Sequence, residues 1–408
     1  MSKLQNYNGR YCESEFESAF LAFLEDEGWN YLAGNSIPRV SKTDVIYSDD
    51  LEQFLCKTNP DLIADEVRQI VDSVRLVGAE SEFSTLHKVY GLMVDGIQFI
   101  PKDGLARMIS LIDFEHPENN IFRAVNQFAV EYVNNGQKET RRPDILLYVN
   151  GMPLCVIELK NPADANATVF DAWEQIYIRY WRDIPHLLHF CPLACISDGV
   201  KTRLGTVRTP YEHFYAWRRT NDGDKVSTLP FEETQTMIKG VYSPERFLEI
   251  FRDYIYFQDR DYDSDEKQIV CRYPQFFATR LLKESIVKSV STKSGKGGTY
   301  FGATGCGKTY TMAFLARQLA LRCTDVPEIG SPTIVLIVDR EELQKQGAKL
   351  FTKSKEFLNL GEVSVVPNRK VLREELGARA SGGFYICTIQ KFCDREDDKI
   401  GLINERAN

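Results

Sequence analysis

The sequence has few histidines, no C-x2-C pair of cysteines and no long apolar segment. Its 408 residues include five His and ten Cys, and no two cysteines are spaced as C-x2-C, the usual knuckle of a structural zinc site. No apolar run approaches the roughly 20 residues of a membrane span, and the N-terminus lacks the apolar core of a secretory signal. We therefore expect a cytoplasmic protein with reduced thiols and no membrane partner.

The composition is that of a globular protein, with 43% hydrophobic and 26% charged residues. A chain of this length predicts two or three domains. The net charge of −8 is unevenly distributed. Residues 1–267 carry 28 Lys+Arg against 43 Asp+Glu, a net −15, whereas residues 268–408 carry 22 against 15, a net +7. The overall acidity therefore does not exclude a nucleic-acid partner.

Apolar periodicity predicts an α/β protein with a domain boundary in the polar, charge-dense segment 258–267. After residue 275, helical segments alternate with short apolar strands, which is typical of a parallel sheet. The expected helices and strands before the boundary are a helix at 13–27, a strand at 125–133, a hairpin of 144–149 and 153–160 around Asn150-Gly151, and a helical stripe from 169 to 180. Those expected after it are a helix at 310–321 and strands at 333–338 and 384–389.

The sequence Arg142-Pro143-Asp144, followed after thirteen residues by Glu158-Leu159-Lys160, suggests metal-dependent phosphodiester cleavage. Triplets of an acid, any residue and lysine arise by chance, and two others occur at Asp265–Lys267 and Asp397–Lys399. Glu158–Lys160 differs because it ends an apolar run, so alternation places Glu158 and Lys160 on one face of a buried strand. Asp144 and Glu158 could then bind Mg²⁺, and Lys160 could position the attacking water. The alternative is a hairpin end with a solvated Glu–Lys pair.

The geometry of this hairpin gives a sharper expectation. With a regular two-residue turn at Asn150-Gly151, Asp144 would pair with Ile157, and Glu158 would point to the opposite side of the sheet. Shared metal binding therefore predicts either a three-residue connection or a β-bulge.

A second motif, Gly302-Ala303-Thr304-Gly305-Cys306-Gly307-Lys308-Thr309, matches the phosphate loop G-x-x-x-x-G-K-[ST]. It follows a short apolar segment at 299–301 and precedes a helical run. Gly305 and Gly307 would allow the backbone N–H groups of the loop to surround the ATP phosphates. Lys308 would neutralise the charge of these phosphates, and the Thr309 hydroxyl would bind the Mg²⁺ of Mg-ATP.

The block RRPDILLYVNGMPLCVIELKNP resembles the nuclease core of the restriction (motor) subunit of type I restriction-modification enzymes. The similarity extends from about residue 10 to residue 392 and includes Asn126-Gln127-Phe128. It implies a restriction-endonuclease-like mixed α/β domain of the PD-(D/E)xK type over 1–260, and the first RecA-like helicase lobe over 261–408. It also implies double-stranded DNA as substrate, and methyltransferase and specificity subunits as partners.

The resemblance assigns the catalytic triad to Asp144, Glu158 and Lys160. It matches Glu17, with Glu13 as rival, to an acid on the first helix, and Gln275 to a glutamine that reads adenine. The family's Gln-x-x-x-Tyr motif is one residue longer here, so Gln175 and Tyr180 would lie about 140° apart on a regular helix. Gln175 could still contact DNA or orient Lys160, but Tyr180 could join it only through a local bulge.

Two further questions stay open at this level. His186, His189, Cys191 and Cys195 could form a zinc site, but the apolar residues around them favour a buried strand with core thiols. After residue 392 we find neither a Walker B strand nor a second motor lobe, so we expect a partial motor that lacks ATP-driven translocation by itself. Alternative functions are a repair-type nuclease–helicase and an ATP- and DNA-binding module with an inactive nuclease site.

Overall fold

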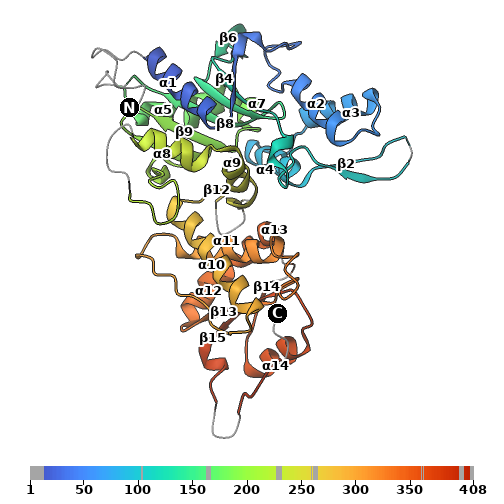
Figure 1. The fold of residues 1–408 in the computed structure, drawn as a ribbon, viewed down its shortest axis with the longest axis vertical. Helices are drawn as coiled ribbons and strands as arrows, with labels where there is room; N and C mark the ends of the chain where they lie inside the picture. The colour runs from blue at the N-terminus through green and yellow to red at the C-terminus, as the bar shows by residue number, and fades with distance from the viewer. Residues whose placement is uncertain are drawn as a thin grey trace. The chain divides into compact units, whose positions relative to one another are not determined.

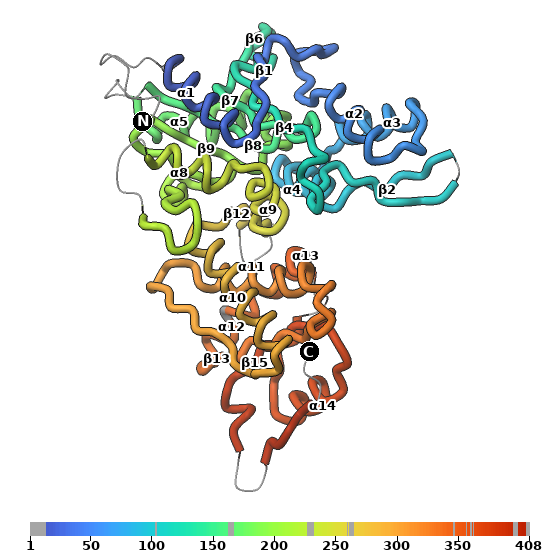
Figure 2. Tube along the Cα trace, in the orientation of Figure 1, coloured from blue at the N-terminus to red at the C-terminus, as the bar shows by residue number. Residues whose placement is uncertain are grey.

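The structure is a computed structural model (Figures 1 and 2). It describes residues 13–102, 104–161, 167–226, 232–258, 260, 265–359, 361, 363–394 and 399–404. The chain divides into an N-terminal unit, Met1–Ile255 with Asp259–Val270, and a C-terminal unit, Tyr256–Gln258 with Cys271–Asn408. Part of the expected boundary, residues 259 and 261–264, lies outside the described residues. None of the described helices has the length and apolar character needed to cross a membrane.

The N-terminal unit is organised around a mixed β-sheet with the strand order β1-β4-β7-β8-β9-β10. The β1–β4 and β8–β9 pairs are parallel and the other neighbours are antiparallel. Every residue of β7, β8 and β9 is buried, as expected when both faces of a sheet are covered. The strands are β1 (Asn30–Ala33), β4 (Phe122–Asn126), β7 (Ile145–Val149), β8 (Met152–Leu159), β9 (Leu193–Ser197) and β10 (Thr202–Thr206).

Helices lie around this sheet, and the unit also contains two antiparallel ribbons (Figure 1). Helix α1 contacts β1, β4 and β8, and α5 contacts β8 and β9. The helices are α1 (Glu13–Asp26), α2 (Ser48–Thr58), α3 (Ala64–Arg75), α4 (Glu82–Asp95), α5 (Val169–Glu174), α6 (Trp181–Asp183), α7 (Pro185–Leu188), α8 (Glu232–Val241) and α9 (Pro244–Asp253). The ribbons pair β2 (Ile97–Phe99) with β3 (Arg107–Ile109) and β5 (Val130–Asn134) with β6 (Gln137–Arg141).

The single strand expected over 125–133 is wrong. Strand β4 ends at Asn126, and β5 begins at Val130 and pairs with β6 instead of the central sheet. The chain turns at Gln127, whose φ is +50° and whose backbone N–H donates to the Asp144 carbonyl (3.0 Å). The turn Asn135-Gly136, with both φ values positive, closes the β5–β6 ribbon, and this dipeptide was the sequence signal for it.

The C-terminal unit contains the expected parallel sheet, in the order β13-β15-β14. Its strands are β13 (Ile334–Val338), β14 (Val363–Val365) and β15 (Phe384–Thr388), and its helices are α10 (Tyr273–Ser291), α11 (Lys308–Leu321), α12 (Glu341–Lys353), α13 (Lys355–Leu358) and α14 (Arg369–Ala378). Two further strands, β11 (Ile255–Gln258) and β12 (Lys267–Val270), lie in the connecting segment, and single 3-10 turns occur at Gly34–Ser36, Pro117–Asn119, Tyr211–His213 and Ile389–Lys391.

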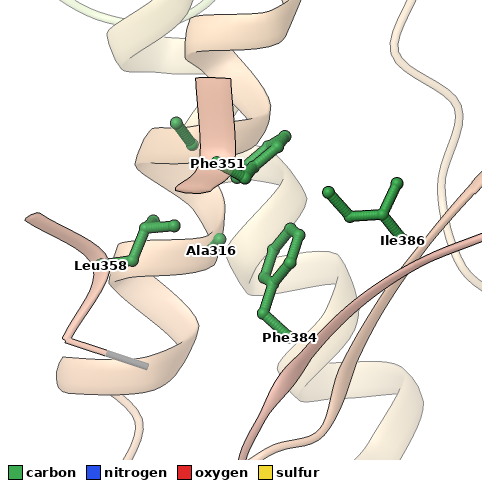
Figure 3. Close-up of a cluster of buried hydrophobic side chains, with 6 residues drawn as sticks. Ala316, Phe351, Leu358, Phe384 and Ile386 are labelled. Atoms are coloured by element: carbon green, nitrogen blue, oxygen red, sulfur yellow. The ribbon is translucent and has the colours of Figure 1, made fainter. Parts of the chain in front are cut away.

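The core of the C-terminal unit forms where helices pack on β15 (Figure 3). Phe351 of α12 stacks on Phe384 of β15, with ring centroids 4.5 Å apart, and Ile386 lies beside them. Residues 299–301, expected as the apolar start of the phosphate loop, belong to no strand, and the Phe301 side chain is exposed. Nothing in the described chain pairs with this segment, so its apolar character alone does not make it a strand.

Candidate active site

The β7–β8 hairpin contains a two-residue turn and a β-bulge. The turn is Asn150-Gly151, with φ values of +49° and +75°, as in a type I′ turn. Near the turn Tyr148 pairs with Pro153, but the next pair is Leu147 with Cys155, so one residue of β8 is left over. If both carboxylates are to bind one metal ion, the hairpin needs a three-residue connection or a β-bulge. The structure contains the bulge.

The bulge brings Asp144 and Glu158 to the same side of the sheet. Beyond it, paired residue numbers add to 302, as in Leu147 and Cys155, and Asp144 with Glu158 gives the same sum. Asp144 Oδ2 accepts a hydrogen bond from the Leu159 backbone N–H (2.7 Å), which holds its carboxylate at the end of β8. Both side chains are buried, with exposed fractions of 7% for Asp144 and 0% for Glu158.

Burial makes the Glu158 carboxylate costly to ionise. Loss of hydration raises its pKa well above the usual value, and the nearby Asp144 charge raises it further. Lys160 acts in the opposite direction, with Nζ 3.9 Å from Glu158 Oε2. Within the described part of the chain, Oε2 has no hydrogen-bond partner. A buried carboxylate oxygen that accepts no hydrogen bond there, beside a second carboxylate, is suited to a cation.

A chain of hydrogen bonds connects Lys160 to Glu158 through the segment after α5. Lys160 Nζ donates to Gln175 Oε1 (3.0 Å), Gln175 Nε2 donates to the Tyr180 hydroxyl (2.8 Å), and that hydroxyl donates to Glu158 Oε1 (2.5 Å). Tyr180 is 1% exposed, and burial raises its pKa well above the usual value, which keeps the hydroxyl protonated as the donor.

The backbone of this segment explains how Tyr180 reaches Gln175. Residues Gln175–Tyr180 form a π-helix, in which hydrogen bonds run from residue i to i+5 and one extra residue fits into a turn. This is the local bulge without which Tyr180 would lie on another face of the helix. The segment 169–180 is helical, as its apolar stripe predicts, but it is not a regular α-helix throughout, because α5 ends at Glu174 and the π-helix follows.

Glu17 of α1 lies at the edge of this site. Its Oε1 accepts from Asn126 Nδ2 (2.7 Å) and its Oε2 accepts from Gln127 Nε2 (2.8 Å). Gln127 Nε2 is also 3.4 Å from Asp144 Oδ1, so one amide group connects the two acids. Sequence reasoning had no physical signal for Gln127, which appeared only in a block of family resemblance. The side chain of the rival Glu13 lies outside the described residues.

The donor set of the site is compatible with magnesium. Mg²⁺ typically takes one or two carboxylates and completes its shell with water and phosphate oxygens, and Asp144 and Glu158 could supply the two carboxylates. Across the described residues, no group of three or more His, Cys, Asp or Glu side chains is arranged to hold a metal ion. His186, His189, Cys191 and Cys195 accordingly form no zinc site there. Burial raises the pKa of the Cys195 thiol to about 12, as expected for a core thiol.

In the C-terminal unit, the phosphate loop has the backbone that its motif predicts. Gly305 and Gly307 have φ values of +80° and +82°, and α11 begins at Lys308, so the loop leads into a helix N-terminus. Lys308 Nζ donates to the backbone carbonyls of Gly302 (2.8 Å) and Ala303 (3.0 Å). Its ammonium group therefore lies beside the first two residues of the loop. The Thr309 side chain is exposed at the second position of the helix.

Gln275 is buried beside this loop rather than exposed on the surface. Its Oε1 accepts from the Arg272 backbone N–H (2.8 Å), and its Nε2 donates to the Gly307 carbonyl (3.1 Å). The structure thus brings Gln275 to the phosphate loop from about thirty residues away in the sequence. In this position its amide group supports the loop backbone.

Comparisons with known proteins match both units of the chain. A family model described as the N terminus of type I restriction enzyme R proteins matches residues 10–213, and a model described as SWI2/SNF2 ATPase matches residues 274–408. These matches confirm the expected fold classes, a nuclease-type mixed α/β unit followed by a helicase-type ATPase region.

Curated relatives extend over most of the chain. It is 30% identical over 413 residues to the type I restriction enzyme HindI endonuclease subunit of Haemophilus influenzae, covering 97% of this chain and 38% of that protein. It is 26% identical over 426 residues to the putative type I restriction enzyme MjaIXP endonuclease subunit of Methanocaldococcus jannaschii, covering 96% and 38%. The chain thus spans 38% of the length of these two relatives. Because the family model for the N terminus of these proteins matches half of its residues, the chain belongs to the type I restriction enzyme R proteins.

Proposed function

We propose that the N-terminal unit is a Mg²⁺-dependent DNA endonuclease and that the C-terminal unit binds ATP. Together they would act in the restriction subunit of a type I enzyme, which cleaves double-stranded DNA after ATP-driven translocation. Methyltransferase and specificity subunits would supply target recognition, because we found no sequence-reading motif in this chain. The observation that carries the proposal is the juxtaposition of Asp144, Glu158 and Lys160 by the β-bulge.

Each residue of the site has a distinct role in this proposal. Asp144 and Glu158 would hold Mg²⁺, which when bound supplies a Lewis acid for the phosphate and lowers the pKa of a water. The Lys160 ammonium would orient the attacking water and offset the charge that develops on the phosphate. Gln175 and Tyr180 fix Lys160 and Glu158 relative to each other, since their hydrogen bonds span both groups. Glu17, held by Asn126 and Gln127, adds a third negative charge at the edge of the site.

In the C-terminal unit, we propose that Gly305, Gly307 and Lys308 bind the ATP phosphates and that Thr309 binds the accompanying Mg²⁺. The support is the backbone conformation of the loop and its position at the N-terminus of α11. We also propose that Gln275 takes part in adenine recognition; the support is its hydrogen bond to the Gly307 carbonyl of the loop.

The test of the nuclease proposal is metal-dependent cleavage of duplex DNA by the purified chain. We expect Lys160→Ala to lower the cleavage rate by about 10²–10⁴-fold, since it removes the group that positions the reacting water. Lys267→Ala is the matched control: Lys267 ends one of the other acid-x-lysine triplets, and its side chain is exposed. The control should cleave at the wild-type rate.

The outcome also separates the alternative functions. Mg²⁺-dependent cleavage that persists in Lys160→Ala would contradict the assignment of the site. Absence of cleavage by the wild-type chain, with DNA and ATP binding intact, would favour a binding module with an inactive nuclease. Active protein that does not associate with a methyltransferase would favour a repair-type nuclease–helicase.

A further inference from the structure

A cleft of about 890 Å³ opens beside the candidate nuclease site in the N-terminal unit. Its walls come from the segment after β1 and from the ends of β4 and β6. The lining residues include three cations, Arg39, Lys42 and Arg142, together with amide side chains, but no Asp or Glu. Because residues 1–267 have 43 acidic residues against 28 basic ones, a cleft lined only by positive charge is unexpected there.

The three cations differ in how they are bound. The Arg39 guanidinium is part of the wall: it lies 3.9 Å from the centre of the Phe128 ring and donates to the Ala129 carbonyl. Lys42 and Arg142 are exposed, and neither side chain has a hydrogen bond or ion pair in the part of the chain that the structure describes. Two unpaired cations on the rim of a basic cleft are available to an anionic ligand.

The cleft is connected to the site by residues that belong to both. The side chains of Asn126 and Gln127 line the cleft and also donate to the Glu17 carboxylate. Gln127 Nε2 reaches Asp144 Oδ1 at 3.4 Å, and Arg142 precedes Asp144 by two residues, with Pro143 between them. A polyanion lying in the cleft would therefore continue to the two carboxylates of the site.

Close packing of the backbone defines one wall. A Cβ atom on Gly34 would lie 2.5 Å from the Asn126 carbonyl oxygen and 2.6 Å from Phe128 Cα. The segment that carries Arg39 and Lys42 can approach the end of β4 this closely because residue 34 has no side chain. The distance between the two sides of the cleft is thus set by main-chain contacts.

We propose that this cleft binds the phosphodiester backbone of duplex DNA, with Lys42 and Arg142 contacting phosphates next to the one that is cleaved. The inference rests on the proposed nuclease function and extends it to the residues that position the substrate. Cationic side chains of this kind bind backbone phosphates without regard to base sequence. Such binding suits a subunit in which we found no sequence-reading motif.

The test measures the affinity of the full chain for a short DNA duplex, by fluorescence anisotropy in EDTA at several salt concentrations. For Lys42→Ala/Arg142→Ala we expect about tenfold weaker binding per lost cation near 0.1 M salt, and a slope of log affinity against log salt that is smaller by about 2. Arg218→Ala/Lys225→Ala is the matched control, because it removes the same two charges from exposed residues that do not line the cleft. Equal thermal unfolding temperatures would establish that both variants are folded.

Cleavage by the same preparations separates this inference from the function on which it rests. If the wild-type chain cleaves DNA but both double variants bind like wild type, or lose affinity equally, the cleft does not hold the DNA and the nuclease proposal stands. A wild-type chain with no measurable affinity for the duplex would also overturn the inference. Loss of affinity in the cleft variant alone, with its reduced salt slope, would support it even if no cleavage were seen.

Discussion

The carboxylate site of the N-terminal unit and the phosphate loop of the C-terminal unit differ in burial and in the sequence separation of their parts. Glu17, Asp144 and Glu158 are each less than 10% exposed, and they come from helix α1, the residue before β7 and strand β8, spread over more than 140 residues. Lys308 and Thr309 are exposed and lie within one continuous motif of eight residues. The first site is made by tertiary packing, and the second mostly by local backbone.

Because of this difference, the two sites should be sensitive to different kinds of substitution. The carboxylate site depends on strand register, because a shift of one residue would move Glu158 to the other face of the sheet. The phosphate loop depends on backbone N–H groups and positive φ angles, which the glycines provide wherever the loop is placed. Substitutions that disturb register should therefore affect the first site and spare the second.

The largest expected effect is on folding free energy, and it concerns the glycine in the turn of the β7–β8 hairpin. A Cβ on Gly151 would lie 2.0 Å from the Tyr47 carbonyl oxygen, whereas at Gly136, in the equivalent Asn-Gly turn of the β5–β6 ribbon, it would meet nothing within 4 Å. We expect Gly136→Ala to cost about 1 kcal/mol of folding free energy, from the left-handed φ alone. Gly151→Ala should cost about 3 kcal/mol or more, since a backbone clash cannot be relieved by rotating a side chain.

Denaturant unfolding of the two glycine variants would measure these costs. The same preparations should retain ATP binding, because the phosphate loop lies in the other unit. Equal costs for the two variants would show that the buried turn does not constrain the hairpin.

At the phosphate loop we expect Lys308→Ala to weaken ATP binding by about a hundredfold, the loss of a charge-assisted contact of roughly 3 kcal/mol. Lys296→Ala, an exposed lysine in the loop before the motif, is the control and should bind normally. Calorimetric titration with Mg-ATP measures both affinities. Unchanged binding by Lys308→Ala would mean that the motif is only a glycine-rich turn.

The hydrogen-bond chain at the π-helix gives a smaller effect. Tyr180→Phe removes the hydroxyl that donates to Glu158 and accepts from Gln175, and should slow cleavage by about 10–100-fold, as is common when groups that orient ligands are lost. Tyr177→Phe on the same segment keeps its ring stacking on Trp173 and should cleave normally. Equal rates for the two variants, measured under single-turnover conditions, would remove Tyr180 from the site.

The smallest effect concerns stability and its pH dependence. Because the pKa of Glu158 is raised in the folded state, the folded chain binds more protons than the unfolded chain above pH 4.5, and ionisation of Glu158 lowers stability as the pH rises. In EDTA, Glu158→Gln should therefore be more stable than wild type at neutral pH, by about 1–3 kcal/mol. The difference should shrink in mildly acidic buffer, where Glu158 is protonated.

Chemical unfolding of wild type and Glu158→Gln at the two pH values measures this difference. Addition of Mg²⁺ should raise the unfolding temperature of wild type and not of the variant. A variant that is less stable than wild type at neutral pH would indicate that Glu158 is not a buried charge.

Much of this arrangement could be predicted from residue pattern. The spacing of Asp144 and Glu158, combined with the period of a strand, required either a bulge or a three-residue connection, and the structure has the bulge. The phosphate loop followed directly from its motif. In the same way, contact between Gln175 and Tyr180 would require a local bulge, and the structure has a π-helix there.

Other features could not be predicted, because they depend on contacts between distant segments. Gln127 has its place because β4 turns away from the sheet at that residue, and no local pattern distinguishes its amide from a surface glutamine. The segment 299–301 is apolar but belongs to no strand, since strand formation depends on a neighbour with which to pair. The basic cleft combines residues 31–42 with 126–142, whose proximity follows only from the parallel pairing of β1 with β4.

Two single-residue irregularities, the extra residue in β8 and the widened turn before Tyr180, place the groups that surround Glu158. Each extra residue turns the side chains that follow it toward a different face of the strand or helix. The identity of those side chains stays the same. A sequence alignment would show such an extra residue only as a gap of one position. It would not show that the later side chains point in another direction. Among relatives, a one-residue insertion or deletion at the bulge in β8 should therefore indicate loss of nuclease activity better than substitutions elsewhere in the same strand.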